Sequence, residues 1–406
     1  MKLSRLALLL VVLIDVMGQG LIFPIVTTIV MEPSAGFLPL HTSHWVREFD
    51  YGLIIGVFFL SWFLGAAYIS RLSDYIGRKP GILICLGGAL TGYLLTIVAL
   101  YYSNFVVLIL GRAISGFTAA NQPIAQAALV DISKDEQEKT RNMGMIVAAM
   151  SMGLIAGPLM AGVLTDKSFL GRFASLELPF YGAVALVVLN IVLIVWSYHE
   201  KGFKRRKIDF GPSEVFLTLW RVRARPAILR LSAVMFFMLL GLNAFYVFLD
   251  NYMFSRFQFD TLQNSMIMTV FGGTMALASG LLATPLIKRF QKTHIVLVTL
   301  VVMAVSILVF MLNPVADLSY LLLIPLVMAF GVIYPTMLTL FSAGVDATEQ
   351  GWVMGVVIAL YTLGTGSISL IGGYLMSLSI NLPFLISIGS FIVAYMLVKI
   401  LWRESR

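Results

Sequence analysis

Three charged residues lie inside long apolar stretches of this chain, where an ionised side chain is costly. Asp15 and Asp250 carry carboxyl groups that can exchange a proton or pair with a cation, and Arg112 carries a guanidinium that stays protonated. One charge at the centre of a bilayer costs roughly 2.5–3.5 kcal/mol on insertion scales, so we expect these groups to face a protein interior. They offer proton exchange or solute binding. The alternatives are a structural hydrogen bond for Asp15 and an interfacial carboxylate for Asp250.

Further polar side chains share a helical face with these charges, because residues three or four positions apart lie one above the other on a helix. Gln19 follows Asp15 by one turn, and Asn243 and Tyr246 precede Asp250 at this spacing. A third stripe at the same spacing consists of Arg112, Ser115, Ala119, Gln122 and Gln126. The residues that we predict to line a polar cavity are Asp15, Gln19, Arg112, Gln122, Gln126, Asn243, Tyr246, Asp250 and, beside Pro335, Tyr334.

The apolar stretches have the length and composition of membrane-spanning helices. Of the 406 residues, 59% are hydrophobic and only 12% are charged. Runs of about 20 apolar residues match the hydrocarbon thickness of a bilayer, where a helix satisfies its own backbone. We therefore predict an all-α membrane protein with twelve transmembrane helices. Their expected ranges are 5–30, 50–71, 80–101, 105–131, 142–165, 179–198, 229–254, 261–287, 293–312, 318–342, 351–377 and 382–402.

The N-terminal stretch imitates a secretion signal, with Lys2 and Arg5 before an apolar run. The run continues past Asp15 without a good small-residue cleavage site, so we interpret it as a retained first helix. With the N-terminus in the cytoplasm, most Lys and Arg fall in cytoplasmic segments, which is the positive-inside bias. Both termini are therefore expected in the cytoplasm, and the net charge of +8 follows from topology rather than from nucleic-acid binding. The basic residues outside those segments are Arg47, Lys167, Arg172, Arg256 and the intrahelical Arg112.

A basic connection at residues 201–228 divides the expected helices six and six. We predict an N-terminal six-helix bundle at 1–200 and a C-terminal six-helix bundle at 229–406. The connection is either a basic tether or, because Phe216, Leu219 and Trp220 share one face, an interfacial helix. Small residues of the fifth helix are echoed in the eleventh, and such pseudo-repeats are typical of secondary transporters. The first set, for which we expect close helix packing, is Gly153, Gly157, Pro158 and Gly162.

The stretch GAAYISRLSDYIGRKP, residues 65–80, places several charges between the second and third expected helices. Gly77 suits a tight turn with positive φ. Asp74 can pair with Arg78 or accept hydrogen bonds from a nearby helix N-terminus. We predict a gating loop formed by Asp74, Gly77, Arg78 and Lys79, with simple positive-inside anchoring as the alternative, above all for Lys79.

This loop resembles the G-x-x-x-D-x-x-G-R-K signature of the major facilitator superfamily, with Ser70 at the first glycine position. Three further stretches resemble motifs of its twelve-helix drug:proton antiporters, the branch of the tetracycline exporters. They are IDVMGQGLIFP in the first helix, LGRAISGFTAA in the fourth and GLIAGPLMAG in the fifth, where Ala161 replaces a glycine. The resemblance covers the whole chain. It implies the major facilitator fold, with the first, fourth, seventh and tenth helices around a central cavity, and a role for Arg112 in coupling.

Other functional classes find little support in the sequence. There is no Walker loop, no cluster of metal ligands and no nucleophile paired with a base, so we expect neither an enzyme nor a cofactor or metal. We predict a monomeric, proton-coupled antiporter in a bacterial-type inner membrane that exports a small organic molecule by alternating access. The direction rests on the resemblance. A metabolite or siderophore exporter or importer of the same fold is the alternative.

Overall fold

The computed structural model describes residues 2–200, 219–346 and 349–402, and within these ranges every regular element is helical. The chain divides into two compact units, one of Met1–Glu214 with Phe259–Thr269 and one of Val215–Gln258 with Val270–Arg406. The boundaries at 200 and 229 stay a prediction. Residues 201–218, including Phe216 of the proposed interfacial helix, lie outside the described ranges.

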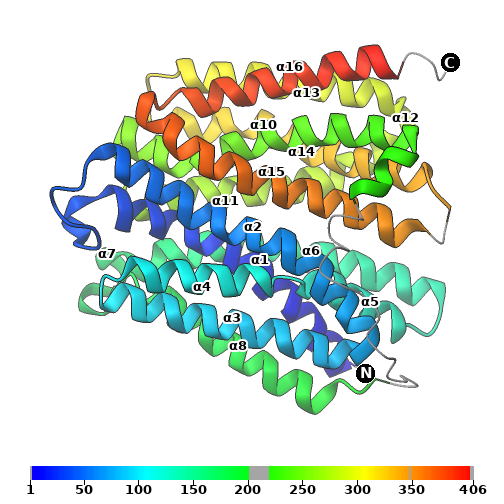
Figure 1. Ribbon diagram of the computed structural model, residues 1–406, viewed down its shortest axis with the longest axis horizontal. Helices are drawn as coiled ribbons and strands as arrows, with labels where there is room; N and C mark the ends of the chain where they lie inside the picture. Colours follow the sequence, from blue (N-terminus) through cyan, green and yellow to red (C-terminus); the bar gives the residue numbers. More distant parts are fainter. Residues whose placement is uncertain (1, 201–218, 347–348, 403–406) are drawn as a thin grey trace. The chain divides into compact units, whose positions relative to one another are not determined.

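Twelve described segments are long and apolar enough to cross a membrane, as the sequence predicts. The first six contain α1 (Lys2–Met31), α2 (His44–Ile76), α3 (Arg78–Tyr101), α4 (Phe105–Phe117) with α5 (Asn121–Asp131), α6 (Glu136–Thr165) and α8 (Leu178–Ser197), and a short α7 (Lys167–Leu170) lies between the last two. The second six contain α10 (Pro226–Phe257), α11 (Thr261–Leu277) with α12 (Ala283–Arg289), α13 (Lys292–Leu312), α14 (Leu318–Ala343), α15 (Gln350–Leu378) and α16 (Leu382–Leu401). In Figure 1 the colours follow these helices along the chain, from blue at the N-terminus to red at the C-terminus.

Two of the expected helices are interrupted where proline removes a backbone donor. The predicted helix at 105–131 breaks over residues 118–120 into α4 and α5. Pro123 cannot donate to the carbonyl of Ala119, and its ring crowds that carbonyl. The predicted helix at 261–287 contains a π-helical turn at Ala278–Leu282. Pro285 leaves the carbonyl of Leu281 without its helical partner there.

In the first unit, α1 lies against α6 and α8, while α4 lies against α2 and α3. Glycines allow the backbones to approach. A methyl group at Gly153 would lie 2.7 Å from the carbonyl oxygen of Leu13, and one at Gly157 would lie 2.3 Å from that of Met17. Both contacts are too short for any larger residue, so the predicted close packing is confirmed for these two positions.

In the second unit, α10 packs against α15 and α16, and α13 packs against α14 and α16. Phe245 and Tyr252 of α10 meet Phe310 and Phe384, with ring centroids between 4.4 and 6.2 Å apart. Arg256 donates to the carbonyl oxygens of Met311 (2.6 Å) and Asn313 (2.8 Å) at the end of α13. A cation at a helix C-terminus is favourable, so this contact secures the end of α13 against α10.

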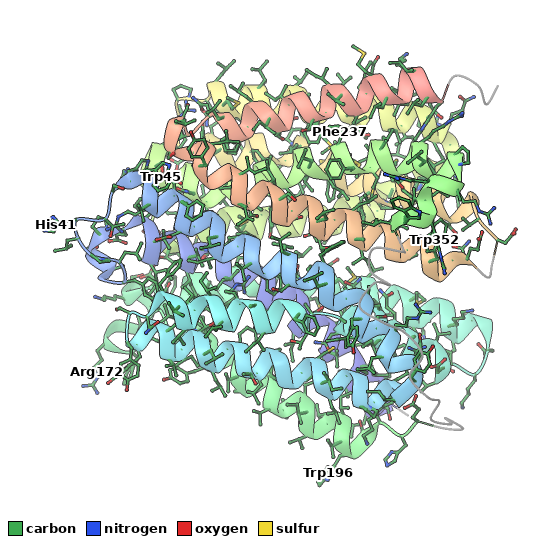
Figure 2. The ribbon with its side chains drawn as sticks, viewed as in Figure 1. His41, Trp45, Arg172, Trp196, Phe237 and Trp352 are labelled. Atoms are coloured by element: carbon green, nitrogen blue, oxygen red, sulfur yellow. The ribbon has the colours of Figure 1, made fainter. Side chains whose placement is uncertain are left out.

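Aromatic and basic side chains mark the ends of the first unit. Figure 2 shows His41 and Arg172 pointing away from the helices at one end, and Trp196 pointing away from α8 near the other. The indole of Trp196 is 79% exposed. Exposed Trp and Tyr side chains at helix ends are typical of the two membrane–water interfaces.

Candidate functional site

A small cavity inside the first unit collects residues from α1, α2, α3 and α4. Its volume open to the centre of a water molecule is about 20 Å³, which is room for about one water. Three of the predicted cavity residues line it, namely Asp15, Gln19 and Arg112. The complete lining is Asp15, Gly18, Gln19, Phe58, Ala89, Tyr93, Arg112, Ser115 and Ala119.

Asp15 of α1 is held at the start of α5. The side chain of Asn121 and the backbone N–H of Gln122 lie beside its carboxyl group, and Oδ2 is buried without a hydrogen-bond partner among the described residues. The first N–H groups of a helix have no partner within the helix, and they form the positive end of the helix dipole. The break at 118–120 therefore exposes a helix N-terminus to a carboxyl group in mid-bundle.

Arg112 of α4 is only 5% exposed, and its guanidinium lies 4.2 Å from the ring centroid of Phe58. Within the described ranges no ion pair or hydrogen bond reaches the guanidinium, and Nε is buried without a hydrogen-bond partner. A cation over an aromatic face gains about 2 kcal/mol when desolvated, and the adjacent cavity can hold a water.

Gln122 and Gln126 do not line this cavity. Both are half-buried on α5, and Nε2 of Gln122 lies 3.3 Å from Sδ of Met150 on α6. The predicted stripe from Arg112 to Gln126 assumes one continuous helix. The break before α5 ends that register, so the second half of the stripe faces other neighbours.

The predicted residues of the second unit lie on α10 and α14. Asp250 is fully buried, and neither carboxyl oxygen has a hydrogen-bond partner in the part of the chain that the structure describes. Asn243 donates to the carbonyl oxygen of Leu239 on its own helix at 2.8 Å. The rings of Tyr246 and Phe271 lie 4.8 Å apart, and the ring of Tyr334 lies 5.5 Å from that of Phe330.

The loop between α2 and α3 has the predicted turn and the predicted ion pair. Gly77 has φ 109°, and Nη1 of Arg78 lies 2.5 Å from Oδ1 of Asp74. Nη1 of Arg78 also donates to Oγ of Ser73 at 2.9 Å, and its Nε lies 3.8 Å from Oδ2 of Asp131 at the end of α5. One guanidinium thus joins α2, α3 and α5.

Glu200, just after α8, accepts the backbone hydrogen bonds that we assigned to Asp74. Its carboxylate accepts from the N–H groups of Arg78 (2.8 Å) and Lys79 (3.4 Å) at the start of α3. Nζ of Lys79 donates to the carbonyl oxygen of Val195 at 2.8 Å. Burial, with Glu200 and Asp131 nearby, raises the pKa of Tyr198 above its usual range. Glu200 was not predicted from the sequence, where a lone carboxylate after an apolar run is the only signal.

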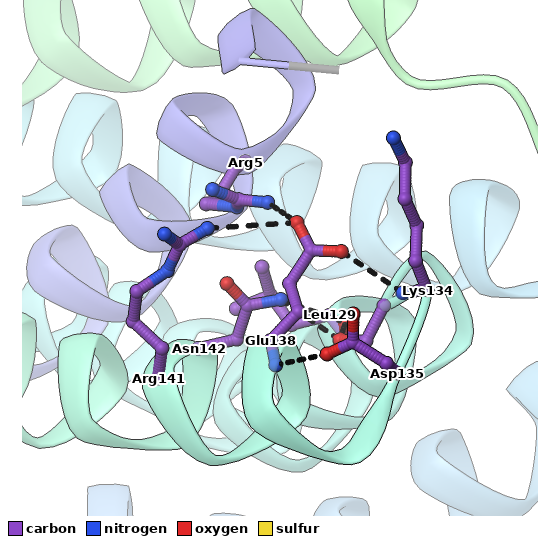
Figure 3. Close-up of polar contacts among 8 residues, drawn as sticks. Arg5, Leu129, Lys134, Asp135, Glu138, Arg141 and Asn142 are labelled. Atoms are coloured by element: carbon purple, nitrogen blue, oxygen red, sulfur yellow. Dashed lines mark hydrogen bonds and ion pairs between the residues drawn. The ribbon is translucent and has the colours of Figure 1, made fainter.

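A second charged cluster joins α1 to α6, and it too was missed (Figure 3). The guanidinium of Arg5 pairs with the carboxylate of Glu138, which also lies 3.6 Å from Nη2 of Arg141. Oε2 of Glu138 accepts from the backbone N–H of Lys134 at 2.9 Å, and Asp135 caps α6 by accepting from the N–H of Glu138 at 2.7 Å. The spacing of Asp135 and Glu138 is that of a capping box, which is the signal that the sequence offers. Within the described ranges, no group of three or more His, Cys, Asp or Glu side chains could hold a metal ion.

The sequence profile of the Major Facilitator Superfamily matches residues 8–364 and, a second time, residues 231–406. Among similar proteins is the class D tetracycline resistance protein of Salmonella ordonez, 29% identical over 87% of this chain and 85% of its own. Another is the quinolone resistance protein NorA of Staphylococcus aureus, 26% identical over 86% of this chain and 87% of its own.

Solved transporters share the fold. The structure of a D-xylose-proton symporter aligns with a TM-score of 0.79 at 13% identity, over 99% of this chain and 97% of that one. The human organic anion transporter MFSD10 aligns with a TM-score of 0.73 at 21% identity, over 98% and 99%. The predicted fold and the resemblance to drug antiporters are confirmed, and the chain is a multi-pass membrane transporter rather than an enzyme. It belongs to the Major Facilitator Superfamily.

Proposed function

We propose that this transporter exports a small organic molecule in exchange for protons, by alternating access. The observation that carries the proposal is the carboxyl group of Asp15, which shares a cavity with Arg112 and keeps one buried oxygen free of partners. An unpaired ionised carboxylate in a dry interior is costly, so this group holds a proton when the cavity is closed. Water or substrate entering the cavity lowers that cost and lets the proton leave.

The two charges of the cavity give the exchange a simple electrostatic basis. With Asp15 ionised, its charge and that of Arg112 cancel. With Asp15 protonated, the cavity carries one positive charge. A solute that interacts with Arg112 or Asp15 therefore binds one protonation state better than the other, and such differential binding is what couples two ligands thermodynamically. Gln19 supplies amide donors and acceptors on the same wall.

The proton gradient supplies enough energy without a nucleotide. Moving one charge across 100 mV yields about 2.3 kcal/mol. At about 1.4 kcal/mol for each factor of ten, this supports a roughly fifty-fold concentration gradient per charge moved. The direction of export is supported by the tetracycline and quinolone resistance named for the similar proteins.

We propose roles in the same transport cycle for the remaining predicted residues. Asp74, Gly77, Arg78 and Lys79, with Glu200, form a gating loop at the cytoplasmic end, and the contacts of Gly153 and Gly157 with α1 form a packing hinge together with Pro158 and Gly162. We also propose that the proton and substrate cavity, in other states of the transport cycle, includes Gln122, Gln126, Asn243, Tyr246, Asp250 and Tyr334. We further propose a monomer in a bacterial-type inner membrane with both termini in the cytoplasm, in line with the positive-inside bias.

A second candidate is favoured by the unpaired guanidinium of Arg112. A charge without a carboxylate partner within the described residues is suited to a carboxylate-bearing solute, because a planar guanidinium binds carboxylates with two parallel hydrogen bonds. This favours the alternative of a metabolite or siderophore exporter or importer of the same fold.

The test uses the purified full chain in proteoliposomes with an imposed pH gradient. Tetracycline, a fluoroquinolone and a panel of carboxylate metabolites are compared as substrates. We expect gradient-driven accumulation of a drug by the wild type, its loss in Asp15→Asn, and no change in Asp317→Asn. Asp317 is an exposed carboxylate whose side chain caps no helix. Accumulation that is insensitive to the pH gradient would contradict proton coupling, and accumulation of carboxylates alone would favour the second candidate.

A further inference from the structure

Tyr93 is the one ionisable side chain of the cavity lining that the sequence analysis did not single out. It reaches the cavity from α3 and is only 8% exposed, with its ring 6.3 Å from that of Phe180. Its hydroxyl group lies in a lining that also includes Asp15 and Arg112. A hydroxyl is both a donor and an acceptor, so its position beside a cavity with room for one water leaves it available to either neighbouring charge.

Gly18 fixes the position of that hydroxyl. A methyl group at Gly18 would lie 1.8 Å from Oη of Tyr93 and 3.0 Å from Cζ. The hydroxyl therefore lies directly against α1, one turn after Asp15 on the same helix. Neither the ring nor α1 can shift far, because Gly153 and Gly157 hold α1 against α6 by backbone contact. The glycine of the G-x-G pattern in α1 thus makes room for an oxygen atom of α3.

The two charges of the cavity do not pair directly. Asp15 and Arg112 form no ion pair with each other in the described structure, yet both line the cavity that the side chain of Tyr93 reaches. A tyrosine placed between a carboxyl group and a guanidinium can donate to the first and accept from the second, either directly or through one water. No other hydroxyl of the lining touches α1 in this way: Oγ of Ser115 lies against Gly92 of α3.

We propose that Tyr93 is a positioning residue that connects Asp15 to Arg112, so that the protonation of the carboxyl group sets the orientation of the guanidinium. When Asp15 is ionised, the hydroxyl donates to it and presents its lone pairs to Arg112. When Asp15 is protonated, the carboxyl group can donate to the hydroxyl, whose proton then turns away from Asp15 and repels Arg112. The proposal rests on the proposed function, since it describes how the coupling passes between two charges.

Tyr93→Phe removes the oxygen and keeps the ring, so the helix packing should survive. A lost hydrogen bond to a charged group corresponds to about a ten-fold effect or more. We therefore expect the number of protons moved per substrate to fall about ten-fold, with substrate affinity within about three-fold of the wild type. The measurement is simultaneous proton and substrate flux in proteoliposomes. Tyr181→Phe, on the exposed side of α8, is the matched control and should not change the ratio.

Gly18→Ala tests the same contact from α1. Its methyl group displaces the hydroxyl, so we expect the same loss of coupling and a lower thermal unfolding midpoint. In the double variant with Tyr93→Phe the oxygen is gone and Cζ is the nearest atom at 3.0 Å. The midpoint should then recover while coupling does not fall further. Because both variants break one contact, their effects on coupling should not add.

The outcomes separate this proposal from the proposed function. If the wild type moves substrate without protons, the proposed function fails. If the wild type couples the two and Tyr93→Phe keeps the wild-type ratio of protons to substrate, the positioning role of Tyr93 is overturned and the proposed function stands. Additive coupling losses in the double variant would also overturn it.

Discussion

The charged side chains of the first unit lack partners in the cavity but are paired at the loop between α2 and α3. In the cavity, Asp15 keeps a free oxygen and Arg112 has an aromatic ring instead of a carboxylate. At the loop, Arg78 pairs with Asp74 and Asp131. Charges held by partners are stabilised in one arrangement, whereas a charge without partners depends on what enters beside it. We therefore expect the coupling of protons to substrate to depend on the cavity, where the charges lack partners, more than on the loop.

Asp250 in the second unit is a third case. It lacks partners as Asp15 does, and it is fully buried. If missing partners alone made a carboxyl group functional, Asp250 would match Asp15. If access for water is also required, the two carboxyl groups should differ in every transport measurement.

The largest effect is expected from Arg112→Ala. Proton-driven accumulation should fall at least about 100-fold, while stability changes little because no buried carboxylate loses its partner. Arg112→Lys should recover little, since an ammonium reproduces neither the planar fork nor the stacking on Phe58. Accumulation in vesicles and thermal unfolding measure both effects, with the loop variant Arg172→Ala as the control. Wild-type coupling in Arg112→Ala would reduce Arg112 to a packing residue.

Asp74→Asn asks whether a paired charge can nevertheless be functional. The pair with Arg78 is about half exposed at the carboxylate, and exposed pairs stabilise by about 0–1 kcal/mol, so expression and topology should be intact. Because the pair ties the loop in one position, we expect transport to fall about ten-fold, as for other gating elements. Lys79→Gln should be milder. Normal transport by Asp74→Asn would leave the loop as a topological anchor.

Glu138→Gln probes a pair that should matter for stability alone. It removes the charge that pairs with Arg5, whose Nε is already buried without a partner. We expect a lower unfolding midpoint, with the ratio of protons to substrate unchanged. Glu177→Gln, which removes no capping hydrogen bond, is the control for thermal unfolding. An altered ratio in Glu138→Gln would place this cluster in the coupling pathway.

Asp250→Asn should have the smallest effect. Replacing the carboxyl group by an amide removes the cost of a charge in this dry position, so the unfolding midpoint should rise by about 2–4 °C. Coupled transport should stay within about a factor of three of the wild type, because a fully buried carboxyl group is out of reach of water. A complete loss of coupling would make Asp250 the proton carrier. It would also show that a carboxyl group does not need access to water to carry the proton.

The sequence predicts features that depend on local chemistry. Apolar run lengths give the twelve spans, Gly77 takes the expected positive φ, and Asp74 pairs with Arg78 four residues later. In each case the partner atoms lie within a turn or two along the chain, so propensity and spacing determine the outcome. The packing of Gly153 and Gly157 follows equally from residue size.

Features that depend on which helices meet could not be predicted. Helical spacing places Gln122 beside Arg112 only if the helix is continuous, and Pro123 ends that continuity. Glu200 reaches a backbone more than a hundred residues away, and Tyr93 meets Gly18 from another helix. A single sequence shows a tyrosine in an apolar run but not the helix that it faces. Pro123 and Gly18 are the signals that the sequence offers for these two features.

The proton exchange of Asp15 is the central claim, and substrate-induced proton release from the detergent-solubilised protein tests it most directly. When a drug that binds is added in weak buffer, the wild type should release protons in a fixed ratio to the binding sites filled. Asp317→Asn should release the same number. Asp15→Asn should bind the drug, as measured by the shift in its unfolding midpoint, and release none. Equal proton release by Asp15→Asn and the wild type would contradict the account.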